Sequence, residues 1–186
     1  NSILFLLTPA DDESKLNTLI AKLVMFKALW DADAPLSQVL PSLHAANAER
    51  YAGATIRSVC SEMHQFYKSR DIKGLQRQCF RAESFPEMAM MPQDAYRALV
   101  GNDVDYLPLD QCKGRIAATL ALIYPPGIGV VVPGERWDQR AQPMLDYLHA
   151  FEESFNRFPG FNYEVQGVFQ EKVDGRIVFH SYVVRE

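Results

Sequence analysis

Residues 114–135 read GRIAATLALIYPPGIGVVVPGE, and the pattern of this stretch decides the fold class. Two apolar runs, Ile116–Ile123 and Ile128–Val132, lie on either side of Tyr124-Pro125-Pro126-Gly127. Runs this short, rich in Ile, Val and Leu and bracketed by Pro and Gly, are typical of strands rather than helices. The paired prolines remove two N–H donors, so a hydrogen-bonded ladder cannot continue through them. The stretch therefore predicts two buried strands joined by a stiff loop.

Further strand signals flank this stretch. Val104–Leu109 is a strand candidate that leads into it. Val165–Val173 and Arg176–Val184 are separated by Asp174-Gly175, a dipeptide typical of tight hairpins. Ser2–Leu7 also has the composition of a strand but has no partner strand nearby, and buried backbone groups need such partners. We therefore expect the sequence to be part of a longer protein.

Helical periodicity accounts for most of the remaining sequence. Thr8-Pro9 followed by acidic residues indicates the start of an amphipathic helix over residues 9–30. Residues 31–41 contain two prolines and are typical of a linker with a turn or two of helix. Further helices are expected over residues 55–69, 71–80, 92–100 and 138–156. Helices come first and strands follow with one helix between them, which predicts an α+β fold with an antiparallel or mixed sheet.

Composition narrows the function classes. The chain of 186 residues is 48% hydrophobic and 23% charged, and its formal net charge of −4 gives no reason to expect nucleic acid or an anionic membrane as a partner. No apolar run approaches the roughly 18–20 residues that a membrane span requires. The three cysteines lack CxxC spacing, which favours a reducing compartment and hence the cytoplasm.

The side chains that carry chemistry form no recognisable motif. Glu152-Glu153 is interpreted as solvated helix surface. Cys112 is interpreted as an ordinary loop cysteine in preference to a thiol of lowered pKa. His64 and His180 are interpreted as structural or surface residues, and His44 and His149 are interpreted as lacking a partner at metal-ligand spacing. The sequence thus predicts neither a metal site nor a catalytic residue in this chain.

The exact residues of the central stretch are nevertheless informative. Gly114-Arg-Ile-Ala-Ala118, Tyr124-Pro-Pro-Gly-Ile128 and Val132-Pro-Gly-Glu135 closely resemble the C-terminal part of bacterial ornithine/lysine/arginine decarboxylases. The resemblance extends over essentially the whole chain through five further motifs: Asn1-Ser-Ile-Leu-Phe-Leu-Leu-Thr-Pro9, Asp33-Ala-Pro-Leu36, Leu40-Pro-Ser-Leu43, Phe158-Pro-Gly-Phe161 and Gln166-Gly-Val168. It indicates the family and leaves the particular substrate open.

Enzymes of this family depend on pyridoxal phosphate and have the aspartate-aminotransferase type of fold. The resemblance implies that residues 1–32 complete the small domain of that fold and that residues 33–186 form the C-terminal domain. The cofactor requires a Schiff-base lysine, which in this family follows a histidine in a Ser-x-His-Lys segment. None of the seven lysines here follows a histidine. We therefore expect the catalytic residues and the cofactor site to lie upstream, and this chain alone to bind no cofactor and to be inactive.

Five residues are candidates for a supporting role in such an enzyme. Arg115 is expected to form a structural ion pair with Asp110 or Glu135 that pins the strand ends. Alternatively, Asp110 or Glu135 faces the entrance of the active site, where a carboxylate attracts a substrate that bears a distal cation. Tyr124 and Gly127 belong to a rigid loop that is expected to line the same channel.

Two functions of different classes remain open. The first is the C-terminal segment of a basic amino-acid decarboxylase, which converts ornithine to putrescine, with lysine to cadaverine and arginine to agmatine close behind. The resemblance implies that this segment packs on the upstream core of the same polypeptide and takes part in a homo-oligomer. The second is a stand-alone, non-catalytic interaction or regulatory module. A Ser-x-His-Lys segment upstream of Asn1 would favour the first function.

Overall fold

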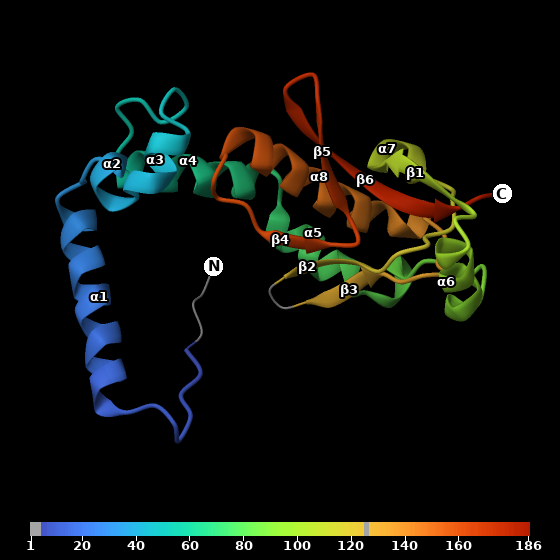
Figure 1. The fold of residues 1–186 in the computed structure, drawn as a ribbon, viewed down its shortest axis with the longest axis horizontal. Helices are drawn as coiled ribbons and strands as arrows, with labels where there is room; N and C mark the ends of the chain where they lie inside the picture. The colour runs from blue at the N-terminus through green and yellow to red at the C-terminus, as the bar shows by residue number, and fades with distance from the viewer. Residues whose placement is uncertain (1–4, 125–126) are drawn as a thin grey trace. The chain divides into compact units, whose positions relative to one another are not determined.

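A computed structural model describes residues 5–124 and 127–186 (Figure 1). The chain divides into two compact units, Asn1–Met63 and His64–Glu186. Helix α4 (Ile56–Ser69) runs through the boundary between them and confirms the helix predicted over residues 55–69. The domain boundary near residue 33 stays a prediction, because a division by compactness does not test where a family domain begins.

The first unit begins with the long helix α1 (Glu13–Asp31). A helix is therefore confirmed over most of residues 9–30, but it starts later than expected, and its apolar residues are not gathered on one face as in an amphipathic helix. Asp12 is its N-cap and accepts a hydrogen bond from the backbone N–H of Lys15 at 2.9 Å. Thr8, the expected N-cap, instead donates to Asp11 through both its backbone N–H and its hydroxyl. None of the residues of α1 is buried.

The segment before α1 differs from its prediction, whereas the segment after α1 agrees with it. The strand predicted over Ser2–Leu7 is wrong for its described part, because residues 5–7 lie outside any strand, and residues 1–4 are outside the described residues. The predicted linker contains the short helix α2 (Leu36–Val39), and α3 (Pro41–Ala46) follows it. Arg57 of α4 donates to the carbonyl oxygens of Trp30 and Asp31 at 2.7 and 2.6 Å. These carbonyls lie at the end of α1, where they have no partner within the helix.

The helices of the second unit follow the sequence signals closely. Helix α5 (Ile72–Cys79) is capped by Asp71, whose carboxylate accepts from the backbone N–H of Gly74 at 3.2 Å. The predicted helix over residues 92–100 is α6 (Pro92–Val100). Asp138 caps the short 3-10 helix η2 (Gln139–Ala141), which leads directly into α8 (Gln142–Arg157). A second 3-10 helix, η1 (Ala82–Ser84), lies between α5 and α6.

The first sheet has the strand order β1-β6-β5 and is antiparallel throughout. Strand β1 (Val104–Pro108) confirms the strand predicted before the central stretch, although Leu109 already begins the short helix α7 (Leu109–Cys112). Strands β5 (Phe169–Val173) and β6 (Arg176–Val184) form the predicted hairpin. Asp174 and Gly175 both have positive φ at its turn, as an Asp-Gly hairpin requires.

The second sheet has the strand order β3-β2-β4 and is also antiparallel. Strand β3 (Ile128–Val131) agrees with its prediction, but β2 is shorter than the first apolar run and covers only Ala121–Tyr124. The earlier part of that run makes isolated bridges, from Ile116 to Arg136 and from Ala117 to Val183. Because Val183 belongs to the first sheet, residues 116–123 connect the two sheets instead of forming one strand.

Gly167 divides the strand predicted over Val165–Val173. Strand β4 (Glu164–Gln166) pairs with β2 in the second sheet, whereas β5 pairs with β6 in the first. Gly167 has φ of +71°, and a Cβ atom placed on it would lie 1.8 Å from the carbonyl oxygen of Leu120. Only glycine fits this close approach. The chain therefore changes sheets at the one residue that can make the turn.

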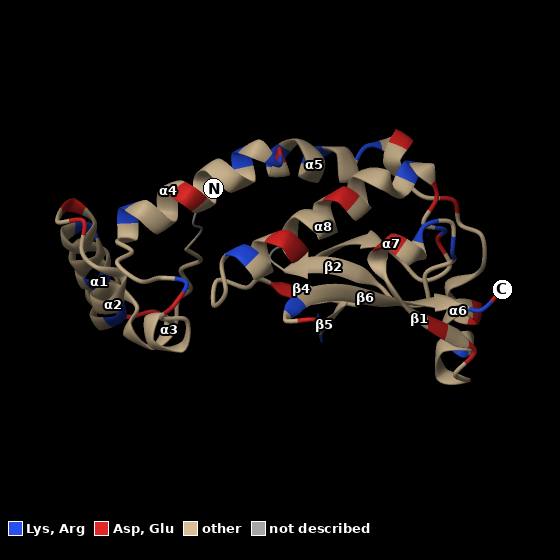
Figure 2. Cartoon of the chain, turned by 90° about the horizontal axis from the view of Figure 1, so that it is seen from above, with Lys and Arg blue, Asp and Glu red and all other residues tan. Residues whose placement is uncertain are grey.

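Helix α8 provides the core of the second unit. It packs along β6 on one side and α5 on the other, so the helices form layers over the strands (Figure 2). Eight of its residues are buried, and six of these join Trp137, Phe179 and Val183 in one apolar cluster. Together the two units give an α+β fold with helices first and antiparallel sheets after them.

Candidate functional site

The residues predicted to line an active-site entrance lie at three separate places in the second unit. Tyr124 and Gly127 are at the corner between β2 and β3, Glu135 is in the turn after β3, and Asp110 is in α7. Over residues 5–124 and 127–186, no hydrogen bond or ion pair joins any two of these places. The four residues therefore do not form one cleft within this unit through direct contacts.

The corner between β2 and β3 is tight and presents an aromatic ring. Gly127 has φ of +78°, and a Cβ atom on it would lie 2.6 Å from the ring of Tyr124. The backbone N–H of Gly127 donates to the carbonyl oxygen of Ile123 at 3.3 Å. Tyr124 and Ile128 remain more than half exposed. Gly127 thus lets the ring fold back against the backbone, and the two prolines between them lie outside the described residues.

The carboxylate of Glu135 is occupied by its own turn. One of its oxygens accepts from the backbone N–H of Val132 at 2.8 Å. Partial burial raises the pKa of Glu135, while the Val132 N–H opposes this and the nearby Asp138 adds to it. The preceding Gly134 has φ of +91° and approaches Met90, which holds the turn against the 88–90 segment. The main role of the Glu135 carboxylate in this structure is therefore to close the turn, and it is only partly available to solvent.

Asp110 is the more exposed of the two candidate carboxylates, and it contacts a histidine. Its side chain is 88% exposed, and one oxygen lies 3.2 Å from Nε2 of His149 on α8. The interpretation that His149 has no partner at metal-ligand spacing overlooks Glu152, which follows it by three residues and lies 3.9 Å from its Nδ1. The interpretation of Glu152 as solvated surface is also wrong, because Glu152 is half-buried, lies beside His149 and accepts a hydrogen bond from the backbone N–H of Phe179.

Arg115 forms an ion pair, but its partners differ from those predicted. Its guanidinium donates to Asp105 at 2.7 Å and to the carbonyl oxygen of Val184 at 3.1 Å, and it lies 3.9 Å from Glu186. Hydrogen bonds from Arg115 and Arg185 hold the pKa of Asp105 below its usual value. The pair therefore ties the central stretch to β1 and to the end of β6, and neither Asp110 nor Glu135 takes part.

The cysteines show no sign of nucleophilic reactivity. Cys112 is fully buried, and burial raises its pKa to about 12. Cys79 is buried as well, and its pKa rises to about 11 for the same reason. The thiolate is the reactive form of cysteine. Ordinary core positions therefore account for both residues.

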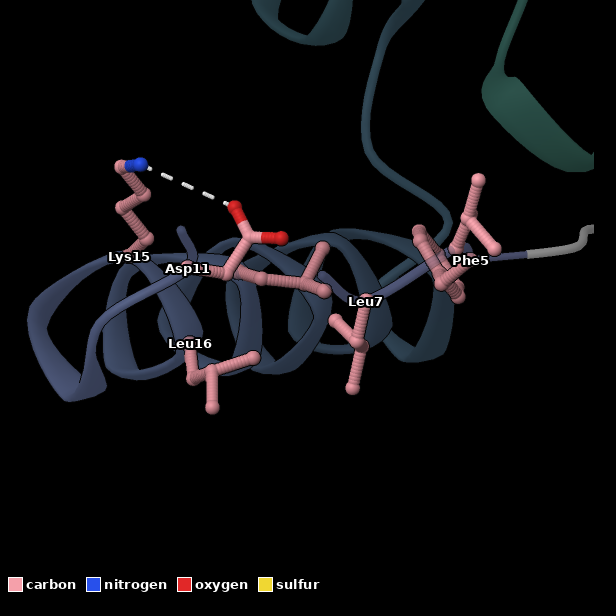
Figure 3. Close-up of a pocket in the computed structure, with 7 residues that line it drawn as sticks. Phe5, Leu7, Asp11, Lys15 and Leu16 are labelled. Atoms are coloured by element: carbon pink, nitrogen blue, oxygen red, sulfur yellow. Dashed lines mark ion pairs between the residues drawn. The ribbon is translucent and has the colours of Figure 1, made fainter. Parts of the chain in front are cut away.

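Two shallow cavities are lined by other residues than the predicted entrance residues, although His149 of the second one contacts Asp110. One, of about 280 Å³, lies in the first unit between residues 5–7 and the start of α1, where Lys15 is 3.7 Å from Asp11 (Figure 3). Its wall is largely apolar, from Phe5, Leu7 and Leu16. The other, of about 370 Å³, lies in the second unit beside α8, and it is lined by Ser69, Arg70, Leu75, Asp146, His149, Ala150 and Glu153.

The residues of this chain do not fit the demands of pyridoxal phosphate. All seven lysines are exposed to solvent, whereas a Schiff-base lysine is activated in a desolvated pocket. In the part of the chain that the structure describes, no group of three His, Cys, Asp or Glu side chains is arranged to hold a metal ion. Within the same part, no helix is both long and apolar enough to cross a membrane.

Comparison with known proteins identifies the family. The family model described as "Orn/Lys/Arg decarboxylase, C-terminal domain" matches residues 73–185. The inducible ornithine decarboxylase of Escherichia coli is 49% identical over 185 residues, which is 100% of this chain and 25% of that protein. Lysine decarboxylase LdcA of Pseudomonas aeruginosa is 37% identical over 177 residues, which is 94% of this chain and 23% of that protein.

The fold agrees with this relationship. The solved structure of lysine decarboxylase A from Pseudomonas aeruginosa matches with a TM-score of 0.86 and 32% identity, over 95% of this chain and 23% of that one. The chain thus spans about a quarter of the length of the curated relatives that it matches. The family match covers more than half of the chain, and the fold match covers nearly all of it. The chain therefore belongs to the Orn/Lys/Arg decarboxylase C-terminal domain family.

Proposed function

We propose that this chain is the C-terminal part of a pyridoxal-phosphate-dependent decarboxylase that converts L-ornithine to putrescine and carbon dioxide. The observation that carries the proposal is the 49% identity to an ornithine decarboxylase over the whole chain. Lysine and arginine are the alternative substrates, and lysine ranks lower because the lysine decarboxylase LdcA is 37% identical. Three free cysteines agree with a cytoplasmic enzyme.

The chain's own role in such an enzyme is structural and electrostatic. Because all seven of its lysines are exposed, we infer that other parts of the polypeptide supply the Schiff-base lysine and the cofactor site. Pyridoxal phosphate would supply the electron sink for decarboxylation there. Exposed apolar side chains support packing on an upstream core and assembly with further copies, and those on the second unit include Phe80, Phe85, Met88, Met91, Tyr96 and Val100.

Asp110 is the best candidate for an entrance residue in this chain. A basic amino acid carries a distal cation, and an exposed carboxylate near its path raises the local substrate concentration. The side chain of Asp110 is exposed enough to act in this way, while the carboxylate of Glu135 is held by the backbone of Val132. Tyr124 and Gly127 would contribute a rigid wall through their tight corner.

The test uses the protein at its full natural length, supplied with pyridoxal phosphate. We expect carbon dioxide release with the highest kcat/KM for L-ornithine among L-ornithine, L-lysine and L-arginine. Asp110→Asn should raise KM for ornithine about two- to threefold at low ionic strength and have less effect in high salt, because salt screens exposed charges. Asp174→Asn is the matched control, since Asp174 is an exposed carboxylate in the β5–β6 turn.

Failure would take two distinct forms. A protein that binds the cofactor but releases no carbon dioxide from any of the three amino acids would contradict the assigned reaction. A protein that does not bind pyridoxal phosphate would instead support the alternative of a non-catalytic interaction or regulatory module. An unchanged KM for Asp110→Asn would remove only the entrance role of Asp110.

A further inference from the structure

His149 stands between carboxylates from two elements of the second unit. Its Nε2 lies 3.2 Å from a carboxylate oxygen of Asp110 on α7, and its Nδ1 lies 3.9 Å from a carboxylate oxygen of Glu152, one turn further along α8. The other oxygen of Glu152 accepts a hydrogen bond from the backbone N–H of Phe179 on β6. Two ion pairs and one hydrogen bond therefore connect α7, α8 and β6 around His149.

The charges around His149 are mainly negative. Asp146 of α8 adds a third carboxylate near the imidazole, in addition to Asp110 and Glu152. On β6, the positive charge of Arg176 lowers the pKa of Glu152. The cavity beside α8 also contains Arg70 and Glu153, which pair with each other, and α5 contributes the apolar Leu75 to its wall. These surroundings favour a cation at His149.

Each ring nitrogen of His149 faces a carboxylate, with Nε2 at 3.2 Å from Asp110 and Nδ1 at an ion-pair distance of 3.9 Å from Glu152. A neutral imidazole carries a single N–H and can donate to only one carboxylate, whereas the imidazolium form donates from both ring nitrogens. We propose that His149 is a proton-controlled clamp, which in its charged form joins α7 to α8 through Asp110 and secures β6 through Glu152. Loss of its proton removes one of the two ties and the charge that strengthens the other.

The direction of the pH dependence follows from the two titrating groups. The adjacent carboxylate of Glu152 raises the pKa of His149 above its ordinary 6.5, burial opposes this, and the charges of Asp110 and Asp146 add to it. The clamp is therefore fully formed below pH 6.5 and is lost as the pH rises through the raised value.

Glu152 sets the acid limit of the clamp. Burial raises its pKa, but hydrogen bonds from His149 and the Phe179 N–H outweigh burial, so the pKa lies below its ordinary 4.5. The contribution of Glu152 is present above pH 4.5 and is lost as the pH falls through the lowered value. The clamp is strongest in the mildly acidic range between these two limits.

Hydrogen–deuterium exchange measures the clamp directly in the protein at its full natural length. Peptides that cover residues 104–112 and 176–184 report on α7 and β6. We expect their protection, corrected for the intrinsic effect of pH on exchange, to fall about two- to fivefold between about pH 5.5 and about pH 8.5, which is the size of a partly exposed ion pair. In His149→Gln the same comparison should show no fall, because glutamine is neutral at both pH values.

Two further variants make the test specific. Asp110→Asn changes an exposed residue, so folding is not at risk, and it should abolish the pH dependence of the α7 peptides while preserving that of the β6 peptides. His64→Gln is the matched control, because His64 is exposed and has no ion pair among the described residues, and it should behave like the unmodified protein.

Three results would overturn the clamp. These are protection in the unmodified protein that does not change with pH, a pH dependence that survives His149→Gln, and a pH dependence that His64→Gln also removes. Amide exchange is independent of catalysis. A failure of the clamp therefore says nothing about the proposed decarboxylase activity, and the activity can fail while the clamp holds.

Discussion

Helices α1 and α8 are similar in length but opposite in burial. None of the nineteen residues of α1 is buried, whereas eight of the sixteen residues of α8 are. Composition does not explain the difference, because α1 carries large apolar residues such as Leu23 and Phe26. Helix α8 has two sheets and α5 to pack against within its own unit. Helical periodicity therefore predicts a helix, while burial depends on whether a partner is present.

The strongest test of this contrast removes the same ring from each helix. Phe155 of α8 is 1% exposed, and Phe26 of α1 is 48% exposed. Phe155→Ala should lower the free energy of unfolding by about 3–5 kcal/mol, because it leaves a cavity in the core. Phe26→Ala should change it by less than about 0.5 kcal/mol in this chain. Urea denaturation followed by Trp137 fluorescence, in a Trp30→Phe background, measures both.

The full natural length of the protein sharpens the same comparison. If the remainder of the polypeptide covers α1, Phe26→Ala should lower the free energy of unfolding of the full-length protein by about 2 kcal/mol or more, as for a buried ring. Equal costs for Phe26→Ala and Phe155→Ala in the present chain would contradict the contrast, since α1 would then be buried by something in solution. A small loss of unfolding free energy in both lengths would contradict the expectation that residues 1–32 complete a larger domain.

A second, somewhat smaller effect is expected where the chain passes from one sheet to the other. Gly167 is where the chain passes from the second sheet to the first, and a Cβ atom there would collide with the carbonyl oxygen of Leu120. Gly167→Ala should therefore lower the free energy of unfolding by about 3 kcal/mol, because the new methyl group is overpacked and the backbone is left-handed.

Gly175→Ala is the matched control for that change. Gly175 also has positive φ, at +80°, but nothing lies within 4 Å of a Cβ atom placed on it. Its replacement should cost only about 1 kcal/mol, from the backbone alone. Thermal unfolding followed by circular dichroism compares the two variants, and equal shifts in Tm would show that the close approach to Leu120 relaxes easily.

Local sequence signals were enough for most elements of the fold. The helix caps at Asp71 and Asp138, the Asp174-Gly175 hairpin and the pairing of β2 with β3 each depend on neighbouring residues, and the structure confirms them, whereas the cap expected at Thr8 is wrong. The split at Gly167 and the crossing at residues 116–123 depend on pairing with distant strands. A continuous apolar run carries no information about which of two sheets each residue joins.

The polar contacts were predicted less well, for a related reason. Arg115 meets Asp105 because β1 pairs with β6, and that register is not visible along the chain. The partners of His149 were partly readable, since His149 and Glu152 are three residues apart and so share a helix face. The contribution of Asp110 required the position of α7, which only the folded structure provides.

The smallest expected effect concerns the other large ring of the α8 core. Trp137 is fully buried, and its indole N–H has no acceptor among the described residues. A buried donor without an acceptor costs about 1–3 kcal/mol, so Trp137→Phe removes that penalty while it leaves a smaller ring in the space. The two contributions oppose each other, and we expect the free energy of unfolding to change by less than about 1 kcal/mol, far less than for Phe155→Ala. Urea denaturation followed by circular dichroism measures it. A loss as large as that of Phe155→Ala would show that the volume of the indole, and not its polar group, decides how well α8 packs.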